Sequence, residues 1–159
     1  VPPPLPDLST VSREMEAEGA FDPESTGDAR RRIERAIVQR QGQGRFRAEL
    51  LENYGGRYPI TGCDLSEALE AAHIVPYNGE QTNHPANGLP LRADIHTLFD
   101  LHLLSIEPES RKVVIAPALR GSCYAELEGK VLERPWQGPE PGRTALAAHH
   151  RLFMARSGY

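Results

Sequence analysis

Three short stretches decide how this chain folds: Ala71-Ala72-His73-Ile74-Val75-Pro76, Asn87-Gly88-Leu89-Pro90-Leu91 and Arg92-Ala93-Asp94-Ile95-His96-Thr97-Leu98-Phe99-Asp100. The first stretch is a short apolar run that carries His73 and is typical of a strand. A polar loop follows it, and Asn87 opens the second apolar run. The third stretch places apolar residues at helical spacing and carries His96, so it predicts a short helix.

The order histidine, asparagine, histidine on strand, loop and helix resembles that of the HNH nucleases. Residues 42–119 are similar to the subgroup of bacterial HNH endonucleases that carries an Ala-His-Ile, an Asn-Gly-Leu and a His-x-x-Phe-Asp block. Three blocks in the family's order are far more specific than a pair of histidines. The resemblance implies a ββα-metal fold that cuts phosphodiester bonds, in a protein of the restriction or defence type.

We therefore expect an α+β fold, in which a ββα-metal core has two N-terminal helices, a following β-hairpin and a C-terminal helix. The elements expected outside the motif are helices over 29–41, with Asp28 as N-cap, and 45–54, a strand and Thr-Gly turn over 58–63, one helical turn over 66–69, hairpin strands at 103–106 and 112–116, and a closing helix over 144–156. Family members often have cysteine where Tyr58 stands, and this departure indicates packing there.

The chain is expected to divide into a proline-rich acidic arm, residues 1–27, and a nuclease domain, residues 28–159, with its core motif at 58–119. The arm is either a tether to an upstream domain or a disordered tail, and the sequence does not separate these alternatives. Nuclease modules of this kind are often fused to a domain that reads the target. We therefore expect specificity to lie upstream of Val1.

Charge is distributed very unevenly along a chain whose formal net charge is −4. The net value argues against a nucleic-acid partner, but residues 29–57 hold eight arginines against three acids. Sixteen of the eighteen basic residues are arginine, which suits bidentate contacts to phosphate. A basic helix face is more often simply solvated surface. Next to the nuclease blocks, DNA is the expected partner.

Composition sets further limits on the class of protein. The hydrophobic fraction of 39% and charged fraction of 25% are those of an ordinary globular domain, and no apolar run is long enough to span a membrane. The two cysteines, Cys63 and Cys123, imply no disulfide scaffold and exclude the four-cysteine zinc knuckle of many HNH proteins. We expect a cytoplasmic location.

The resemblance assigns His73 as the general base and Asn87 as the motif's asparagine. Histidine suits a base because its unperturbed pKa lies near neutrality. A lone histidine on a strand is more often a satisfied structural residue, so the assignment depends on the blocks that follow it. The Asn87 amide can donate and accept at once, which would tie the loop and hold His73 in one orientation. Asn-Gly is also a common hairpin turn, and both roles are compatible.

His96 is assigned by the same resemblance as a metal ligand, with Asp100 on the same helical face four residues later. Asp100 either binds the metal, orients His96, or is a helix-to-strand turn residue. Many HNH enzymes place Asp or His immediately before the base, where this chain and its subgroup have Ala72. His84 and Asp94 are weak candidates for the missing ligand. Oxygen ligands and histidine fit a divalent cation, Mg²⁺ or Mn²⁺/Ni²⁺.

The sequence leaves three functions in competition. The first is a metal-dependent DNA endonuclease domain, and the second is a catalytically weak DNA-binding module with the same fold. The third, a zinc or other structural protein, is disfavoured because cysteine pairs are missing. Adjacent His149 and His150 point about 100° apart on a helix and do not easily share one ion. An HNH domain cuts one strand per site, so double-strand cleavage would imply a homodimer.

Overall fold

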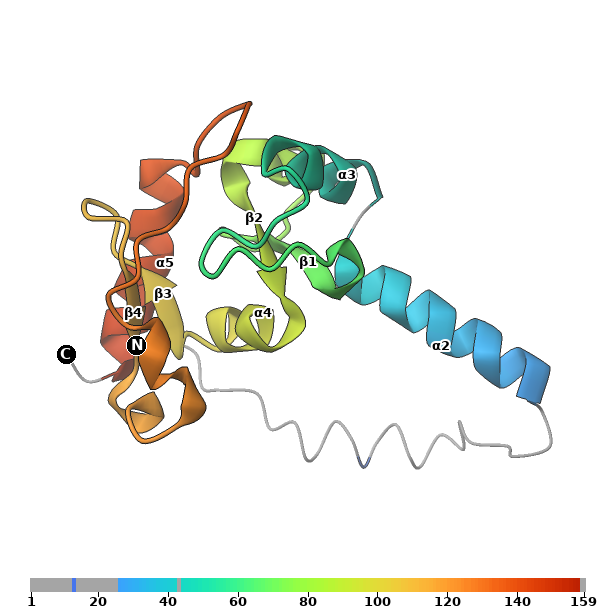
Figure 1. Ribbon diagram of the computed structural model, residues 1–159, viewed down its shortest axis with the longest axis horizontal. Coiled ribbons are helices and arrows are strands. Elements are labelled where there is room, and N and C mark those ends of the chain that lie inside the picture. Colours follow the sequence, from blue (N-terminus) through green and yellow to red (C-terminus); the bar gives the residue numbers. More distant parts are fainter. Residues whose placement is uncertain (1–12, 14–25, 43, 158–159) are drawn as a thin grey trace. The chain divides into compact units, whose positions relative to one another are not determined.

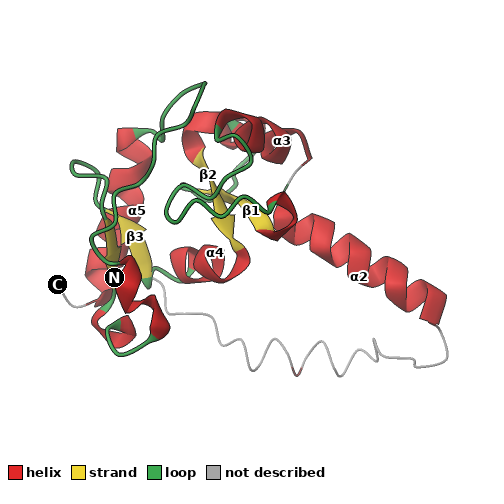
Figure 2. Cartoon of the chain, in the orientation of Figure 1, coloured by secondary structure: helices red, strands yellow, loops and turns green. Residues whose placement is uncertain are grey.

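The structure is a computed structural model that describes residues 13, 26–42 and 44–157. Its helices and strands are α2 (Thr26–Gln41), α3 (Gly44–Asn53), β1 (Leu69–His73), β2 (Gly88–Arg92), α4 (Ala93–Asp100), β3 (Leu104–Ile106), β4 (Val113–Ile115) and α5 (Arg143–Ser157). Figure 1 shows these elements along the chain, and Figure 2 separates helices, strands and loops. The α+β class and the ββα core predicted from the sequence are confirmed.

The chain forms two compact units, and α2 as far as Arg40 belongs to a different unit from the domain that begins at Gln41. Helix α2 starts at Thr26, so Asp28 lies inside it, and the prediction that Asp28 is the N-cap was wrong. Its apolar residues Ile33 and Ile37 are 53% and 38% exposed. The arm predicted over residues 1–27 lies almost wholly outside the described residues and stays a prediction.

The core of the unit that begins at Gln41 is the antiparallel pair β1–β2 followed directly by α4 (Figure 1). The register places Leu69 opposite Arg92 and His73 opposite Gly88. Four of the five residues in each strand are buried, because α3 and α4 both pack against this pair. Strands covered on two faces have near-continuous apolar sequence, which explains the short apolar runs.

Helix α3 buries Phe46 and Leu50 against this sheet, as their spacing of four residues predicted. The strand predicted at the start of residues 58–63 does not form. Instead the Tyr58 amide donates to the Cys63 carbonyl at 2.7 Å, and the Gly62 amide donates to the Tyr58 carbonyl at 2.7 Å. The segment is therefore a closed turn with Tyr58 fully buried, so packing at this position is confirmed.

Short 3₁₀ turns connect these elements: η1 (Ser66–Ala68), η2 (Glu80–Asn83), η3 (Pro85–Asn87), η4 (Pro117–Leu119) and η5 (Cys123–Leu127). The hairpin β3–β4 and the closing helix α5 are confirmed close to their predicted bounds, and they lie side by side (Figure 2). Both cysteines are free thiols. Among the described helices, none combines the length and the apolar character needed to cross a membrane.

A buried histidine fastens α5 to the rest of this unit. His149 Nε2 donates to the Phe99 carbonyl at 2.8 Å, and His149 Nδ1 lies 2.7 Å from the Ser105 hydroxyl, which donates to it. The His149 ring also stacks on the Phe99 ring, with ring centroids 3.6 Å apart. Only the neutral imidazole accepts from Ser105, and burial lowers the pKa of His149 to about 4.

Lowering the pH is expected to destabilise the fold through His149. The unfolded residue titrates near its ordinary value of 6.5 and the folded one near 4, so the unfolded state binds the proton first. The free energy of unfolding should fall by up to about 3 kcal/mol as the pH drops through this window. Urea unfolding at several pH values measures it. His149→Gln should flatten the fall and His150→Gln should keep it; an equally steep fall in both variants would contradict the assignment.

A second prediction concerns the contact between β2 and α3. A methyl group added at Gly88 would lie 2.6 Å from both Leu50 Cδ1 and Phe46 Cζ. Gly88→Ala should therefore lower the free energy of unfolding by about 1–3 kcal/mol, since the core must shift to admit it. At Gly121 an added methyl meets no heavy atom within 4 Å, so Gly121→Ala should change it by less than about 0.5 kcal/mol. Equal effects in urea unfolding would refute the packing argument.

Candidate active site

His73 ends β1 and is held by an aromatic ring and an amide. Its imidazole stacks on Phe46 from α3, with ring centroids 4.5 Å apart and planes inclined by 10°, and Tyr77 meets it edge-on at 5.7 Å. His73 Nε2 lies 2.8 Å from Asn83 Oδ1. An amide oxygen only accepts, so Nε2 carries the proton and Nδ1 keeps a lone pair. Nδ1 is therefore the ring atom available to take a proton.

Asn87 ties the loop between β1 and β2 to the end of β1. Its side-chain oxygen accepts from the Val75 amide at 2.9 Å, and its Nδ2 donates to the carbonyls of Val75 and Thr82, both at 3.0 Å. The Asn87 carbonyl also accepts from the Ile74 amide at 2.9 Å. The expected tie of the loop is present. The expected direct hold on the His73 ring comes from Asn83 instead, a residue that sequence reasoning missed.

His96, on α4, lies between two carboxylates. Its Nδ1 is 2.8 Å from Glu70 Oε1, and its Nε2 is 3.1 Å from Asp100 Oδ2. Burial lowers the pKa of His96, but the hydrogen bonds and charges of Asp100 and Glu70 outweigh burial and raise that pKa above its usual value. Glu70 was missed from the sequence. The signal was a carboxylate within an apolar strand, since buried acids need a partner.

The donor set of this cluster fits a divalent cation held by two protein ligands. Asp100 Oδ2 and His96 Nε2 are adjacent, and the Asp100 side chain is 59% exposed while that of His96 is 18% exposed, so the pair meets solvent mainly through Asp100. Glu70 accepts from the other ring nitrogen, which is the usual orientation of a metal-binding histidine. No three His, Cys, Asp or Glu side chains of the described residues converge as a metal cage. Such a pair suits an ion that retains several waters, as Mg²⁺ does.

The weaker ligand candidates are engaged elsewhere. Asp94 accepts from Arg92 Nη2 and from the Tyr124 hydroxyl, both at 3.0 Å, and these bonds lower the pKa of Asp94 despite its partial burial. His84 Nδ1 accepts from the Ala86 amide at 3.1 Å and so caps the turn η3. The structure joins neither residue to His96.

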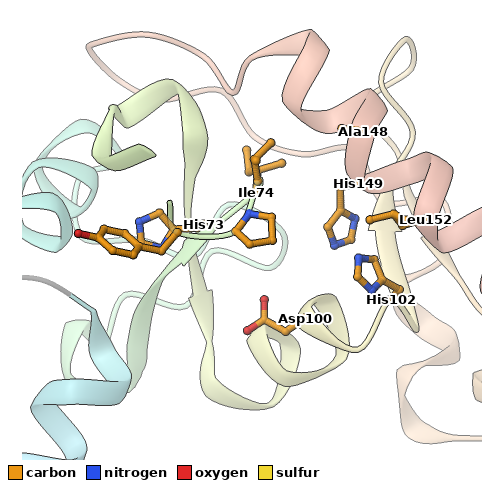
Figure 3. A pocket seen from close by; sticks show the side chains of 10 residues that line it. His73, Ile74, Asp100, His102, Ala148, His149 and Leu152 are labelled. Atoms are coloured by element: carbon orange, nitrogen blue, oxygen red, sulfur yellow. The ribbon is translucent and has the colours of Figure 1, made fainter. Parts of the chain in front are cut away.

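A cleft of about 450 Å³ lies beside the candidate site. His73 and Asp100 both line it, together with residues from the loop after β1, from the end of α4 and from α5. Figure 3 shows Asp100 pointing into the space that separates His73 from His102 and His149. The candidate proton acceptor and a candidate metal ligand therefore line one common space, as expected for metal-assisted hydrolysis.

Comparison with known proteins agrees with this geometry. Residues 58–107 match a family model whose description is HNH endonuclease. Among curated proteins, none matches the chain. The matched residues include β1, β2, the loop between them, α4 and the four residues His73, Asn87, His96 and Asp100. Residues 58–107 of this chain are thus similar to the HNH endonuclease family.

Proposed function

We propose that this protein is a metal-dependent DNA endonuclease domain that hydrolyses phosphodiester bonds with one cation and a histidine base. An HNH domain is a nuclease domain, which implies DNA as the substrate. The observation that carries the finer proposal is the shared cleft, in which the proton acceptor His73 and the carboxylate of Asp100 face the same space. That space is where a water and a phosphodiester would meet.

His73 would act as the general base through Nδ1. Stacking on Phe46 fixes the plane of its ring, and the bond from Nε2–H to Asn83 fixes its tautomer. A proton taken from water at Nδ1 would leave a positive imidazolium whose Nε2–H still points at the amide oxygen. The ring therefore needs no rotation during the step, which lowers the cost of reorganisation.

His96 and Asp100 would hold the cation. When bound, this ion neutralises the negative charge that develops at phosphorus and on the leaving oxygen. Loss of the Nε2 proton makes both His96 Nε2 and Asp100 Oδ2 electron-pair donors. Glu70 keeps the opposite nitrogen, Nδ1, protonated and the ring in place. Glu70 and Asn83 are thus positioning residues in this proposal.

The biological setting proposed here is bacterial restriction or defence, inside the cell, with target specificity in a fused upstream domain. It is supported by the resemblance of the three sequence blocks to that subgroup. The arginine-rich residues 29–57 support contact with the phosphate backbone, which positions a protein without reading sequence.

A catalytically weak DNA-binding module remains the second candidate. The observation in its favour is that His96 Nε2 and Asp100 Oδ2 are the only adjacent donors, since Glu70 bonds the opposite ring nitrogen of His96 and the described residues contain no group of three side chains that could hold a metal ion. Such a module would keep the fold and the phosphate contacts but would lack turnover.

Plasmid nicking separates the two candidates. The wild type should nick supercoiled plasmid with Mg²⁺, Mn²⁺ or Ni²⁺ and leave it intact with EDTA. His73→Ala should slow nicking by about 10²–10⁴-fold, because the positioned base is gone. His150→Ala, a change on α5 outside the cleft lining, should keep the rate. Folded wild type that binds plasmid but leaves it uncut with every ion would favour the binding module.

Metal binding tests the cluster around His96 without any turnover. Glu70→Gln should weaken Mn²⁺ binding by about 10–100-fold, since an amide holds the Nδ1–H of His96 less firmly than a carboxylate does. Titration of free Mn²⁺ by electron paramagnetic resonance measures the dissociation constant. Glu67→Gln, an exposed change in η1, serves as the matched control. An unchanged constant in folded Glu70→Gln protein would remove Glu70 from the site.

A further inference from the structure

The cleft beside the candidate site extends well beyond what a phosphate and a cation need. Its walls include Val75 and Tyr77 from the loop after β1, and Leu152 from α5. These residues are 38%, 52% and 37% exposed, so both the loop after β1 and helix α5 present apolar surface to solvent beside the cleft. No arginine or lysine of the described residues lines this space. The interior is therefore built for an uncharged, flat or apolar group.

The polar side chains that line the cleft further limit which kind of ligand it could hold. His149 has both ring nitrogens engaged, with Ser105 and with the Phe99 carbonyl, so it offers only ring surface. His102 lies beside it, with ring centroids 4.7 Å apart, on the wall opposite His73 (Figure 3). In the described structure His102 Nδ1 is buried without a hydrogen-bond partner. Because this atom has no contact with solvent, it adds no polar group to the open cleft.

A nucleobase has the matching chemistry: its two flat faces stack on rings and apolar side chains, and its polar edge can stay in water. His73 and Asp100 place the scissile phosphodiester at one side of the cleft, so the group covalently attached to that phosphate reaches the interior. The Tyr77 ring would stack on the base. Stacking on an aromatic ring does not depend on which base is present, so we expect little sequence preference. A cleft of about 450 Å³ is ample for one base.

We propose that this cleft binds one unstacked nucleobase of the DNA, adjacent to the phosphodiester that is cut. The inference rests on the proposed nuclease function and adds a base subsite to it. A base in a duplex must leave the stack to enter such a subsite, and a base in a single strand is already close to that state. Single-stranded or distorted DNA should therefore be cut in preference to regular duplex.

An abasic substrate tests the subsite directly. The substrate is a 5′-labelled single-stranded thymidine 20-mer in which one internal residue is a tetrahydrofuran abasic analogue, incubated with Mn²⁺. Wild type should give a ladder of bands with one gap, because one phosphodiester flanking the abasic residue lacks the base that fills the cleft. That band should be about tenfold weaker than its neighbours, in line with the loss of one stacking contact.

Two variants connect the gap to this cleft. Leu152→Trp fills the cleft from α5, and it should weaken all bands and abolish the contrast at the gap. Tyr77→Ala removes an exposed ring that lines the cleft and should have the same effect. It replaces Leu152→Trp as the test if that variant does not fold. Val131→Trp adds the same bulk at a residue that is 55% exposed and does not line the cleft, and it should retain both ladder and gap.

The ladder tests the nuclease and the gap tests the subsite, so the two failures are distinguishable. A complete ladder with no gap would overturn the subsite and leave the nuclease standing. No bands with any ion would overturn the nuclease and the subsite with it. A uniform ladder, together with a dimer that Leu152→Trp converts to monomer, would assign the cleft to a second copy of the chain and overturn the proposal.

Discussion

The side-chain amide of Asn87 is the interaction on which the candidate site depends. Its side-chain oxygen accepts a hydrogen bond from the Val75 amide, as a backbone carbonyl of a neighbouring strand would. Its Nδ2 donates to the carbonyls of Val75 and Thr82. Three hydrogen bonds from one residue close the loop of the β1–β2 pair. That loop carries Asn83, the partner of His73, and Val75 and Tyr77, which line the cleft. One amide thus positions both the partner of His73 and the loop side of the cleft.

The second constraint is a carboxylate in a buried strand. Glu70 is 9% exposed between α3 and α4, and a buried charge is tolerated only when it is paired. His96 satisfies it, and in doing so turns its other ring nitrogen toward Asp100 on the exposed side. The same pairing that makes Glu70 acceptable in the core therefore orients the candidate metal ligand. The Glu70–His96 contact thus both pairs a buried carboxylate and orients the candidate metal ligand.

Helix α5 turns a small ββα core into a site with a cleft. His149 fixes it to the end of α4 through the Phe99 carbonyl and to β3 through Ser105. Because Asp100 directly follows Phe99, this clamp also sets how far α5 stands from the candidate ligand. Leu152, three residues further along α5, lines the same cleft as Tyr77. Helix α5, which lies outside the segment matched to the family, thus forms part of the cleft.

The sequence by itself determined the local part of this protein. The three blocks, the helices that became α3 and α4, the hairpin β3–β4 and the closing helix are all visible as short-range periodicity, and periodicity reports which face of an element is buried. His73, Asn87, His96 and Asp100 were named from the order of the blocks, and their catalytic and metal-binding roles stay predictions. Boundaries were less secure: Asp28 is inside a helix, and residues 58–63 form a turn.

Only the tertiary structure decided which side chains meet. Glu70 and His96 are 26 residues apart, and Ser105 and His149 are 44 apart, so no local pattern links them. Asn83 is one of several polar residues in its loop, and only the fold shows that its side-chain oxygen accepts a hydrogen bond from His73 Nε2. The cleft depends on three segments distant in sequence. Packing of the whole domain decides which residues meet across such distances in sequence. Local propensity and the spacing of residues do not indicate these partners.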